Sequence, residues 1–208
     1  QQVLQWINDG LIGEVRSLHA QFCYANHDPA NIRNNPAAGG GALMDVGCYG
    51  ISTARMIFGV EPLAVNAICL NHPTFGVDDM THLMMKFPDG AAATVMVSTK
   101  TQRSQSVTIE GLHGRIVLSH PFYCDVGDER SVTLETDDSD QTVSFGGEIN
   151  HYQLMLEAFV ESIQNDSPVP LSLDDSVANM AVIDAAFASA KSEAWQPVKQ
   201  FETSIAGE

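Results

Sequence analysis

Basic residues, long apolar runs and targeting signals are scarce in this 208-residue sequence. Lysine and arginine number 10 against 26 aspartate and glutamate residues, which gives a formal net charge of −16. Nucleic acids and anionic membranes bind basic surfaces, so this balance argues against both as partners. No apolar run approaches the roughly 18 residues that suggest a transmembrane helix, and no signal peptide is recognisable.

Disulfide and metal motifs are also missing. The four cysteines lie far apart without a Cys-x-x-Cys pair, and the seven histidines form no H-E-x-x-H or paired Cys/His motif. Structural zinc sites need closely spaced ligands, and free thiols are typical of reducing compartments. We therefore expect no metal site, a cytoplasmic location, and free thiols at Cys23, Cys48, Cys69 and Cys124.

A dinucleotide-binding fingerprint is not found either. The spacing G-x-G-x-x-G occurs nowhere in the sequence. The glycines at 39–41 do not follow a strand within a βαβ unit, which is where such a fingerprint would lie. The chain also opens inside a helical pattern without an initiator methionine. We expect it to be a piece of a longer protein.

The pattern of apolar residues predicts a folded α+β domain over residues 1–208. A hydrophobic share of 44% and a charged share of 17% are typical of globular proteins. Helical periodicity covers residues 1–9, 41–59, 151–164 and 173–193. Strand-like segments cover 13–25, 62–70, 80–87, 91–99, 105–111, 114–119, 131–136 and 141–146. The short turns P-D-G at 88–90 and L-H-G at 112–114 indicate hairpins. We therefore expect a large, mostly antiparallel, open-faced sheet with helices packed on one face.

Some predicted strands are apolar on both faces. Leu83 and Met85 share one face, and Met84 between them lies on the other. If helices cover one face, the second apolar face also needs cover. A second copy related by a two-fold axis is the simplest cover, so we expect a homo-oligomer through the sheet face. A loop or the chain's own termini are the alternative.

The stretch PAAGGGALMDVGCYG at 36–50 carries the candidate chemistry. Asp45 and Tyr49 are spaced i and i+4 on a predicted helix, so both side chains can reach the same space. Gly40 and Gly41 lack a Cβ, which lets another backbone or a flat cofactor ring approach closely, and we name them as cofactor contacts. The alternative is purely structural, because an acid in a first helical turn and a half-buried tyrosine are both common.

A tyrosine in such a place can exchange a proton with a carbon-bound oxygen that undergoes hydride transfer. Its ordinary pKa is about 10, so it needs a cation nearby to act as a base at neutral pH. Asp45 would raise that pKa rather than lower it, and is better suited to orient substrate hydroxyls. No lysine lies near this segment; the nearest in sequence is Lys86. His151 and Tyr152 begin a predicted helix, where a capping or packing role is favoured over a place in a pocket.

These segments resemble a known family. GEVRSLHAQFCY, the stretch from DPANIRNNP to MIFGVEP, FPDGAAATV and TIEGLHGRIVL follow one another in order. They are similar to the C-terminal domain of the glucose–fructose oxidoreductase, inositol dehydrogenase and rhizopine catabolism (Gfo/Idh/MocA) family over about residues 1–199. Asp45 matches the family's aspartate, and Tyr49 stands where most members have histidine. This form resembles the branch of glucose–fructose oxidoreductase, xylose dehydrogenase and dihydrodiol dehydrogenase.

The resemblance implies an oxidoreductase whose N-terminal Rossmann domain, absent here, binds NAD or NADP and supplies a lysine to the phenol. It implies that Tyr49 and Asp45 act at the catalytic site and that the loop carrying Asn31 and Arg33 borders the substrate, a sugar, cyclic polyol or diol. Arg33 pairing with a surface acid is the alternative. Ser52 replaces a second aspartate of many members, which argues against inositol-type substrates. We expect the chain to be inactive alone; a non-catalytic sugar or cofactor sensor is the alternative function.

Overall fold

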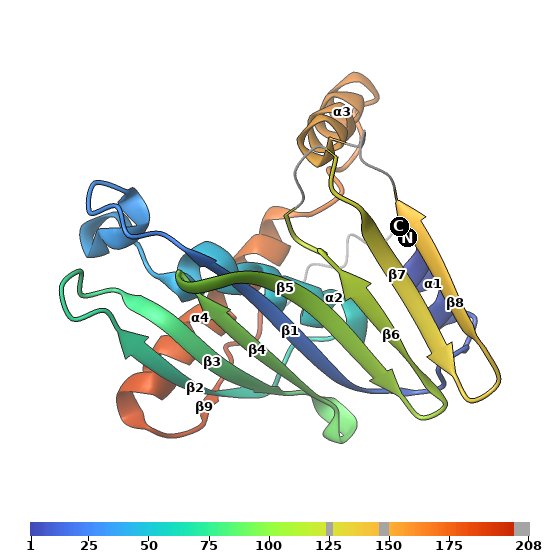
Figure 1. Ribbon diagram of the computed structural model, residues 1–208, viewed down its shortest axis with the longest axis horizontal. Coiled ribbons are helices and arrows are strands. Elements are labelled where there is room, and N and C mark those ends of the chain that lie inside the picture. Colours follow the sequence, from blue (N-terminus) through green and yellow to red (C-terminus); the bar gives the residue numbers. More distant parts are fainter. Residues whose placement is uncertain (124–126, 146–149, 202–208) are drawn as a thin grey trace.

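The computed structural model describes residues 1–123, 127–145 and 150–201, and it has the expected α+β architecture (Figure 1). Nine strands form one sheet in the order β8-β7-β6-β5-β1-β4-β3-β2-β9. The strands are β1 Val15–Ala25, β2 Ala64–Asn71, β3 Asp78–Lys86, β4 Ala92–Ser98, β5 Lys100–Gly111, β6 Gly114–Ser119, β7 Arg130–Thr136, β8 Asp140–Phe145 and β9 Gln196–Pro197. The helices are α1 Gln2–Asn8, α2 Cys48–Phe58, α3 His151–Gln164 and α4 Leu173–Ser192. No described helix is long and apolar enough to cross a membrane.

The strand pairing is antiparallel except between β1 and β4, which run parallel in the middle of the sheet. Short hairpins join β3 to β4 and β5 to β6 at the two predicted turns. The predicted strand 105–111 is too short, because β5 begins at Lys100. Cys23, Cys48 and Cys69 are free thiols, as predicted, while Cys124 and the last residue of the predicted strand 141–146 lie outside the described residues.

Helices α2 and α4 cover one face of the sheet, and the main core lies between them and the strands (Figure 1). Leu83 and Met85 of β3 are buried there, as their alternation predicts. Leu43, Val46 and Ala54, which lie along one side of α2 and of the segment before it, are also buried in this core. Burial of apolar area at roughly 25 cal/mol per Å² makes this face the main source of stability.

The segment predicted as one α-helix over 41–59 has two parts. Residues Leu43–Gly47 are π-helical, and α2 begins at Cys48. The start of the π-helical segment is held from a distant strand, because the buried Asp78 carboxylate accepts the Leu43 N–H at 2.8 Å and the Thr81 hydroxyl at 2.8 Å. π-Helical turns are rare in proteins as a whole, but those that occur are often found at functional sites. Sequence spacing alone does not distinguish it from an α-helix.

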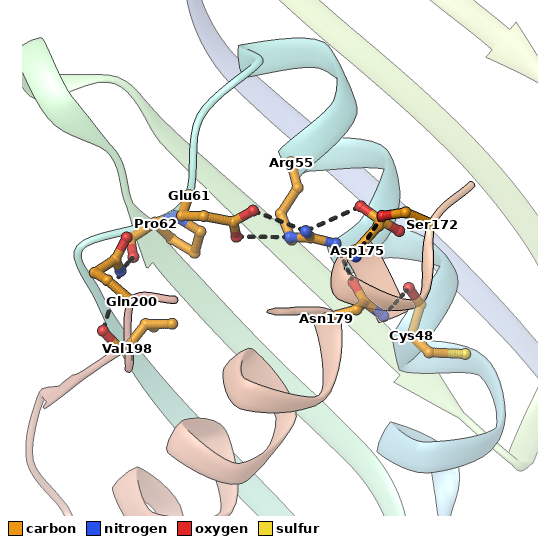
Figure 2. A network of polar contacts seen from close by, with 9 residues as sticks. All are labelled: Cys48, Arg55, Glu61, Pro62, Ser172, Asp175, Asn179, Val198 and Gln200. Carbon is orange, nitrogen blue, oxygen red and sulfur yellow. Dashed lines mark hydrogen bonds and ion pairs between the residues drawn. The ribbon is translucent and has the colours of Figure 1, made fainter. Parts of the chain in front are cut away.

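A buried arginine links α2 to α4 (Figure 2). The Arg55 guanidinium donates to both carboxylate oxygens of Glu61 at 2.7 Å and approaches Asp175 Oδ1 at 3.0 Å. It also donates to Asn179 Oδ1 at 3.3 Å, and the Asn179 amide donates to the Cys48 carbonyl at 3.2 Å. This network therefore ties α4 to the junction between the π-helical segment and α2.

The opposite face of the sheet is open among the described residues. Two rows of neighbouring side chains cross it, as the strand register shows. The rows are Thr108–His19–Thr94–Met84–Asn66 and Ser106–Gln21–Met96–His82–Ile68. Met84 and Ile68 are 46% and 61% exposed, so the face mixes exposed apolar side chains with polar ones.

Candidate active site

A cavity of about 750 Å³ lies where the C-terminal end of β1, the loop after it, the π-helical segment and α3 meet. Strand alternation places Phe22 and Tyr24 on the same face of β1 as the buried Leu18 and Ala20, so both lie on the helix side. The residues around the cavity come from segments that are far apart in the sequence, from Phe22 to Met155. They are Phe22, Tyr24, Ala25, Asn26, His27, Asp28, Asn31, Arg33, Asp45, Val46, Tyr49, Arg103, Phe122, Tyr123, His151, Tyr152 and Met155.

Asp45 is fixed by two partners, one on each carboxylate oxygen. Arg33 Nε donates to Oδ1 at 2.6 Å, and the Tyr24 hydroxyl donates to Oδ2. The ion pair and its hydrogen bond raise the pKa of Arg33, and burial together with the bond to Asp45 raises the pKa of Tyr24 far above its ordinary value. Arg33 therefore stays cationic and Tyr24 stays a proton donor to Asp45 at neutral pH. Charge-assisted hydrogen bonds of this kind orient a carboxylate strongly.

Tyr49 lines the same cavity and is 47% exposed. Burial is the main cause that raises the pKa of its phenol, followed by the neighbouring Cys48 and Tyr152. Asp45 adds to the rise, and Arg33 opposes it. The phenol therefore holds its proton at neutral pH, where it can act as a hydrogen-bond donor or general acid.

Aromatic rings form a second wall next to Tyr49. Phe22 packs edge-on against the Tyr49 ring with centroids 5.6 Å apart, and stacks on Phe122 at 5.3 Å. The Tyr49 and Phe122 centroids are 5.8 Å apart. One wall of the cavity is thus apolar and the other carries Asp45 and Arg33. Such a combination suits a ligand with hydroxyl groups on its edge and an apolar face.

The loop that carries Asn31 and Arg33 is tied to the sheet. The Asn31 side chain accepts the Arg33 N–H at 3.0 Å, which closes a short turn. Lys100 at the start of β5 donates to the Asn26 carbonyl and to Asn34 Oδ1, the latter at 2.8 Å. Both predicted substrate contacts, Asn31 and Arg33, therefore line the cavity on a loop that is held at its base.

The two glycines named as cofactor contacts lie against this chain itself. A Cβ on Gly40 would overlap the Arg33 carbonyl, and one on Gly41, which has φ +120°, would overlap the Asp78 carboxylate. The Gly41 N–H donates to the Arg33 carbonyl at 2.9 Å. The glycines thus close the loop that carries Arg33, and their internal packing accounts for them. Contact with a cofactor stays a prediction.

The favoured interpretation of His151 and Tyr152, a capping or packing role, is right only in part. The cap of α3 is the Asn150 side chain, which accepts the backbone N–H groups of Tyr152 and Gln153. Both rings line the cavity. The His151 ring also packs against the rings of Tyr123 and Tyr152, as a packing role predicts. Capping signals are local, whereas the direction of a side chain at a helix start depends on where the helix lies relative to the sheet.

Sequence reasoning missed Tyr24 and Phe122 as cavity residues. The alternation of β1 indicated that Phe22 and Tyr24 share a face, but that pattern is the same for core packing and for a cavity wall. Phe122 follows β6 and offered no signal. Its place beside Tyr49 arises from the sheet order, which brings the end of β6 near β1 across β5.

Comparison with known proteins places the chain in a family. The model of the GFO/IDH/MocA C-terminal domain matches residues 1–117. An uncharacterized oxidoreductase of Rhizobium meliloti is 34% identical over 203 residues, which cover 95% of this chain and 60% of the relative. A D-xylose 1-dehydrogenase (NADP⁺) of Haloferax volcanii is 30% identical, over 88% of this chain and 56% of the relative.

Solved structures share the fold. The aldose–aldose oxidoreductase of Caulobacter crescentus, in complex with glycerol, has a TM-score of 0.83 at 24% identity, over 93% of this chain and 58% of that one. Levoglucosan dehydrogenase in complex with NADH has a TM-score of 0.78 at 24% identity, over 95% of this chain and 62% of that one. The chain thus spans less than two thirds of the length of these relatives. By the match over more than half of its residues, it belongs to the GFO/IDH/MocA C-terminal domain family.

Proposed function

We propose that this chain is the substrate-binding and oligomerisation domain of an NAD(P)-dependent oxidoreductase that oxidises a CH–OH group of a sugar, cyclic polyol or diol. The observation that carries the proposal is the shared cavity, which is lined both by Asp45, Tyr49 and Arg33 and by the rings of Phe22 and Phe122. A pyranose or a cyclic diol has hydroxyls on its edge and C–H groups on its face, so it matches both walls. The names of the xylose and dihydrobenzenediol dehydrogenases among the relatives agree with such substrates.

In this proposal Tyr49 exchanges a proton with the oxygen of the reacting carbon. A bound nicotinamide supplies the hydride acceptor or donor. Because burial raises the pKa of the Tyr49 phenol, the residue is ready to donate a proton in the direction of reduction. In the direction of oxidation it needs a cation that lowers its pKa, and Arg33 contributes only part of that effect. A lysine from the nucleotide-binding domain would supply the rest.

Asp45 and Arg33 orient the substrate as a pair. Tyr24 and Arg33 each donate one hydrogen bond to a different carboxylate oxygen of Asp45. Each oxygen can accept a further bond, so Asp45 can still accept one from a substrate hydroxyl. Arg33 and Asn31 both line the cavity, and their guanidinium and amide groups can donate hydrogen bonds to substrate oxygens. Tyr24 acts through Asp45 and is a positioning residue in this scheme.

The described residues suit a nicotinamide ring better than a whole dinucleotide. The aromatic wall offers a flat apolar surface next to Tyr49. The sequence has no G-x-G-x-x-G for a pyrophosphate, and the space at Gly40 and Gly41 is taken by this chain. We propose that NAD or NADP is bound mainly by an N-terminal Rossmann domain of the same protein, so that the 208-residue chain is inactive alone.

We further propose that the open sheet face is the oligomer interface. The two rows that cross it expose Met84 and Ile68, and exposed apolar groups on a broad flat sheet favour association with a second copy. Sedimentation of an Ile68→Asp variant tests this: we expect a smaller particle, and an unchanged mass contradicts the interface.

The catalytic role is tested in the full-length protein with NAD⁺ and NADP⁺ against aldoses, inositols and diols. Tyr49→Phe removes only the hydroxyl and should lower kcat at least about 100-fold, the usual contribution of a positioned proton donor. Met56→Leu is the control, because it changes an exposed side chain of α2 that is not among the residues lining this cavity, and it should retain activity. Unchanged kcat in Tyr49→Phe excludes this residue from the chemistry.

A sugar or cofactor sensor on the same fold is the second candidate. The exposure of Tyr49 beside Asp45 favours an enzyme, because a binding site alone does not need a phenol directed at the ligand space. Calorimetry of the full-length protein with the same sugars separates the two. Saturable binding of a sugar that is not oxidised in the presence of NAD⁺ or NADP⁺ supports the sensor.

A further inference from the structure

The apolar side of α3 is exposed to solvent. At about 100° per residue, five of the seven large apolar residues of the helix fall on one side, while Leu154 and Val160 lie outside this group. The glutamine and glutamate residues fall on the opposite side. Each of the five is between 52% and 65% exposed. We call them the α3 stripe: Tyr152, Met155, Leu156, Phe159 and Ile163.

The buried contacts of α3 are short-range, and its first residue, His151, lies edge-on against the ring of Tyr123. Ser162 is the buried residue of α3, and its hydroxyl donates to the carbonyls of Ala158 and Pro168 at 3.1 and 3.2 Å. By contrast, α4 buries Val182 and Ile183 in the core. In Figure 1, α3 stands apart from the layer formed by α2 and α4. A continuous exposed stripe at helical spacing is typical of a surface that a partner covers.

The stripe continues into the cavity wall. Tyr152 and Met155 line the cavity that holds Asp45 and Tyr49. In the proposed function, a nicotinamide carried by another domain must reach Tyr49, so that domain has to lie at the rim of this cavity. The α3 stripe is the apolar part of that rim that the described residues leave uncovered.

Resting on the proposed function, we propose that the α3 stripe is the surface on which the nucleotide-binding domain of the same protein docks. The matched relatives have room for such a domain, because this chain spans 56% to 60% of the length of the two curated relatives described above. A second copy is a poorer occupant. The open sheet face already offers a surface for it, and that face is on the other side of β1 from Phe22 and Tyr24 in the cavity wall.

Photo-crosslinking in the full-length protein tests the docking directly. Phe159 is replaced by p-benzoylphenylalanine, the protein is irradiated, and the crosslinked peptides are identified by mass spectrometry. We expect a crosslink within one polypeptide to a peptide outside these 208 residues. The same probe at Glu161, on the polar side of α3, should give none. Crosslinks to a second copy, to this chain alone, or to nothing overturn the proposal.

Calorimetric unfolding gives a second measurement that does not depend on activity. If the stripe couples two domains, the wild-type full-length protein unfolds in one transition and Phe159→Asp in two, while Glu161→Gln keeps one. Two transitions in the wild type, or one in Phe159→Asp, contradict the docking. A specific crosslink without turnover of any sugar or diol supports the docking and refutes the proposed function. Turnover without the crosslink supports the proposed function and refutes the docking.

Discussion

Replacing Arg55 by methionine tests whether the buried network between α2 and α4 stabilises the fold (Figure 2). The Arg55 side chain is 5% exposed, while Glu61 and Asp175 are 33% and 34% exposed. Methionine fills much of the volume but leaves two carboxylates facing each other without their cation. Breaking a buried pair costs roughly 3–5 kcal/mol, and the partial hydration of both acids favours the lower end, about 3 kcal/mol.

The loss is measured as the free energy of unfolding in urea, followed by the fluorescence of Trp6, which is buried in the core. For a chain of this size, about 3 kcal/mol corresponds to a decrease in Tm of roughly 6–12 °C. Arg16→Met is the matched control, because Arg16 pairs with Glu14 at 2.7 Å on the surface, where both side chains are about half exposed. An exposed pair contributes less than about 1 kcal/mol.

The reasoning is refuted if Arg55→Met loses no more stability than Arg16→Met. It is also refuted if 1 M salt reduces the difference between the two variants to nothing, because a buried pair is screened much less than an exposed one. Arg55→Lys separates charge from geometry. Lysine keeps the charge but cannot bind both oxygens of Glu61, so we expect an intermediate loss.

Three further predictions concern the candidate site and its support. Gly41, with φ +120°, and Gly39, with φ +71°, form a matched pair, because a Cβ on Gly41 overlaps the Asp78 carboxylate and a Cβ on Gly39 meets nothing. Gly39→Ala should lower the free energy of unfolding by about 1 kcal/mol, from the positive φ alone, and Gly41→Ala should lower it by more. Equal losses in the two variants would contradict the packing. Burial raises the pKa of Asp78, so its contribution to stability is complete below the unfolded pKa of about 4 and is lost as the pH rises through the folded pKa. Asp78→Asn should therefore gain stability relative to the wild type between pH 4 and pH 7, and urea midpoints that differ equally at both pH values would exclude this. Lys100→Met removes the side chain that ties down the loop carrying Arg33, and amide exchange of residues 26–35 should accelerate about tenfold, while unchanged exchange would show that the loop is held by other contacts.

Much of the fold could be predicted because helices and strands follow local periodicity. The predicted bounds of 151–164 and 114–119 agree with α3 and β6 residue for residue, and the buried side of β3 follows from alternation. The two predicted turns and the antiparallel hairpins depend on neighbours a few positions apart. The prediction of one α-helix over 41–59 was wrong because the π-helical turn at Leu43–Gly47 has the same apolar spacing as an α-helix.

The spacing of Asp45 and Tyr49 predicted that both side chains reach one space, and both line the cavity although a π-helical turn carries one and α2 the other. By contrast, the contacts of Tyr24 and Arg33 with the two oxygens of Asp45, and the packing of Phe122 beside Tyr49, could be found only from the folded chain. Those residues come from separate strands and loops, and their meeting depends on strand order and register. Short-range periodicity carries no information about which distant segments share a wall, because that is fixed by the packing of the whole sheet.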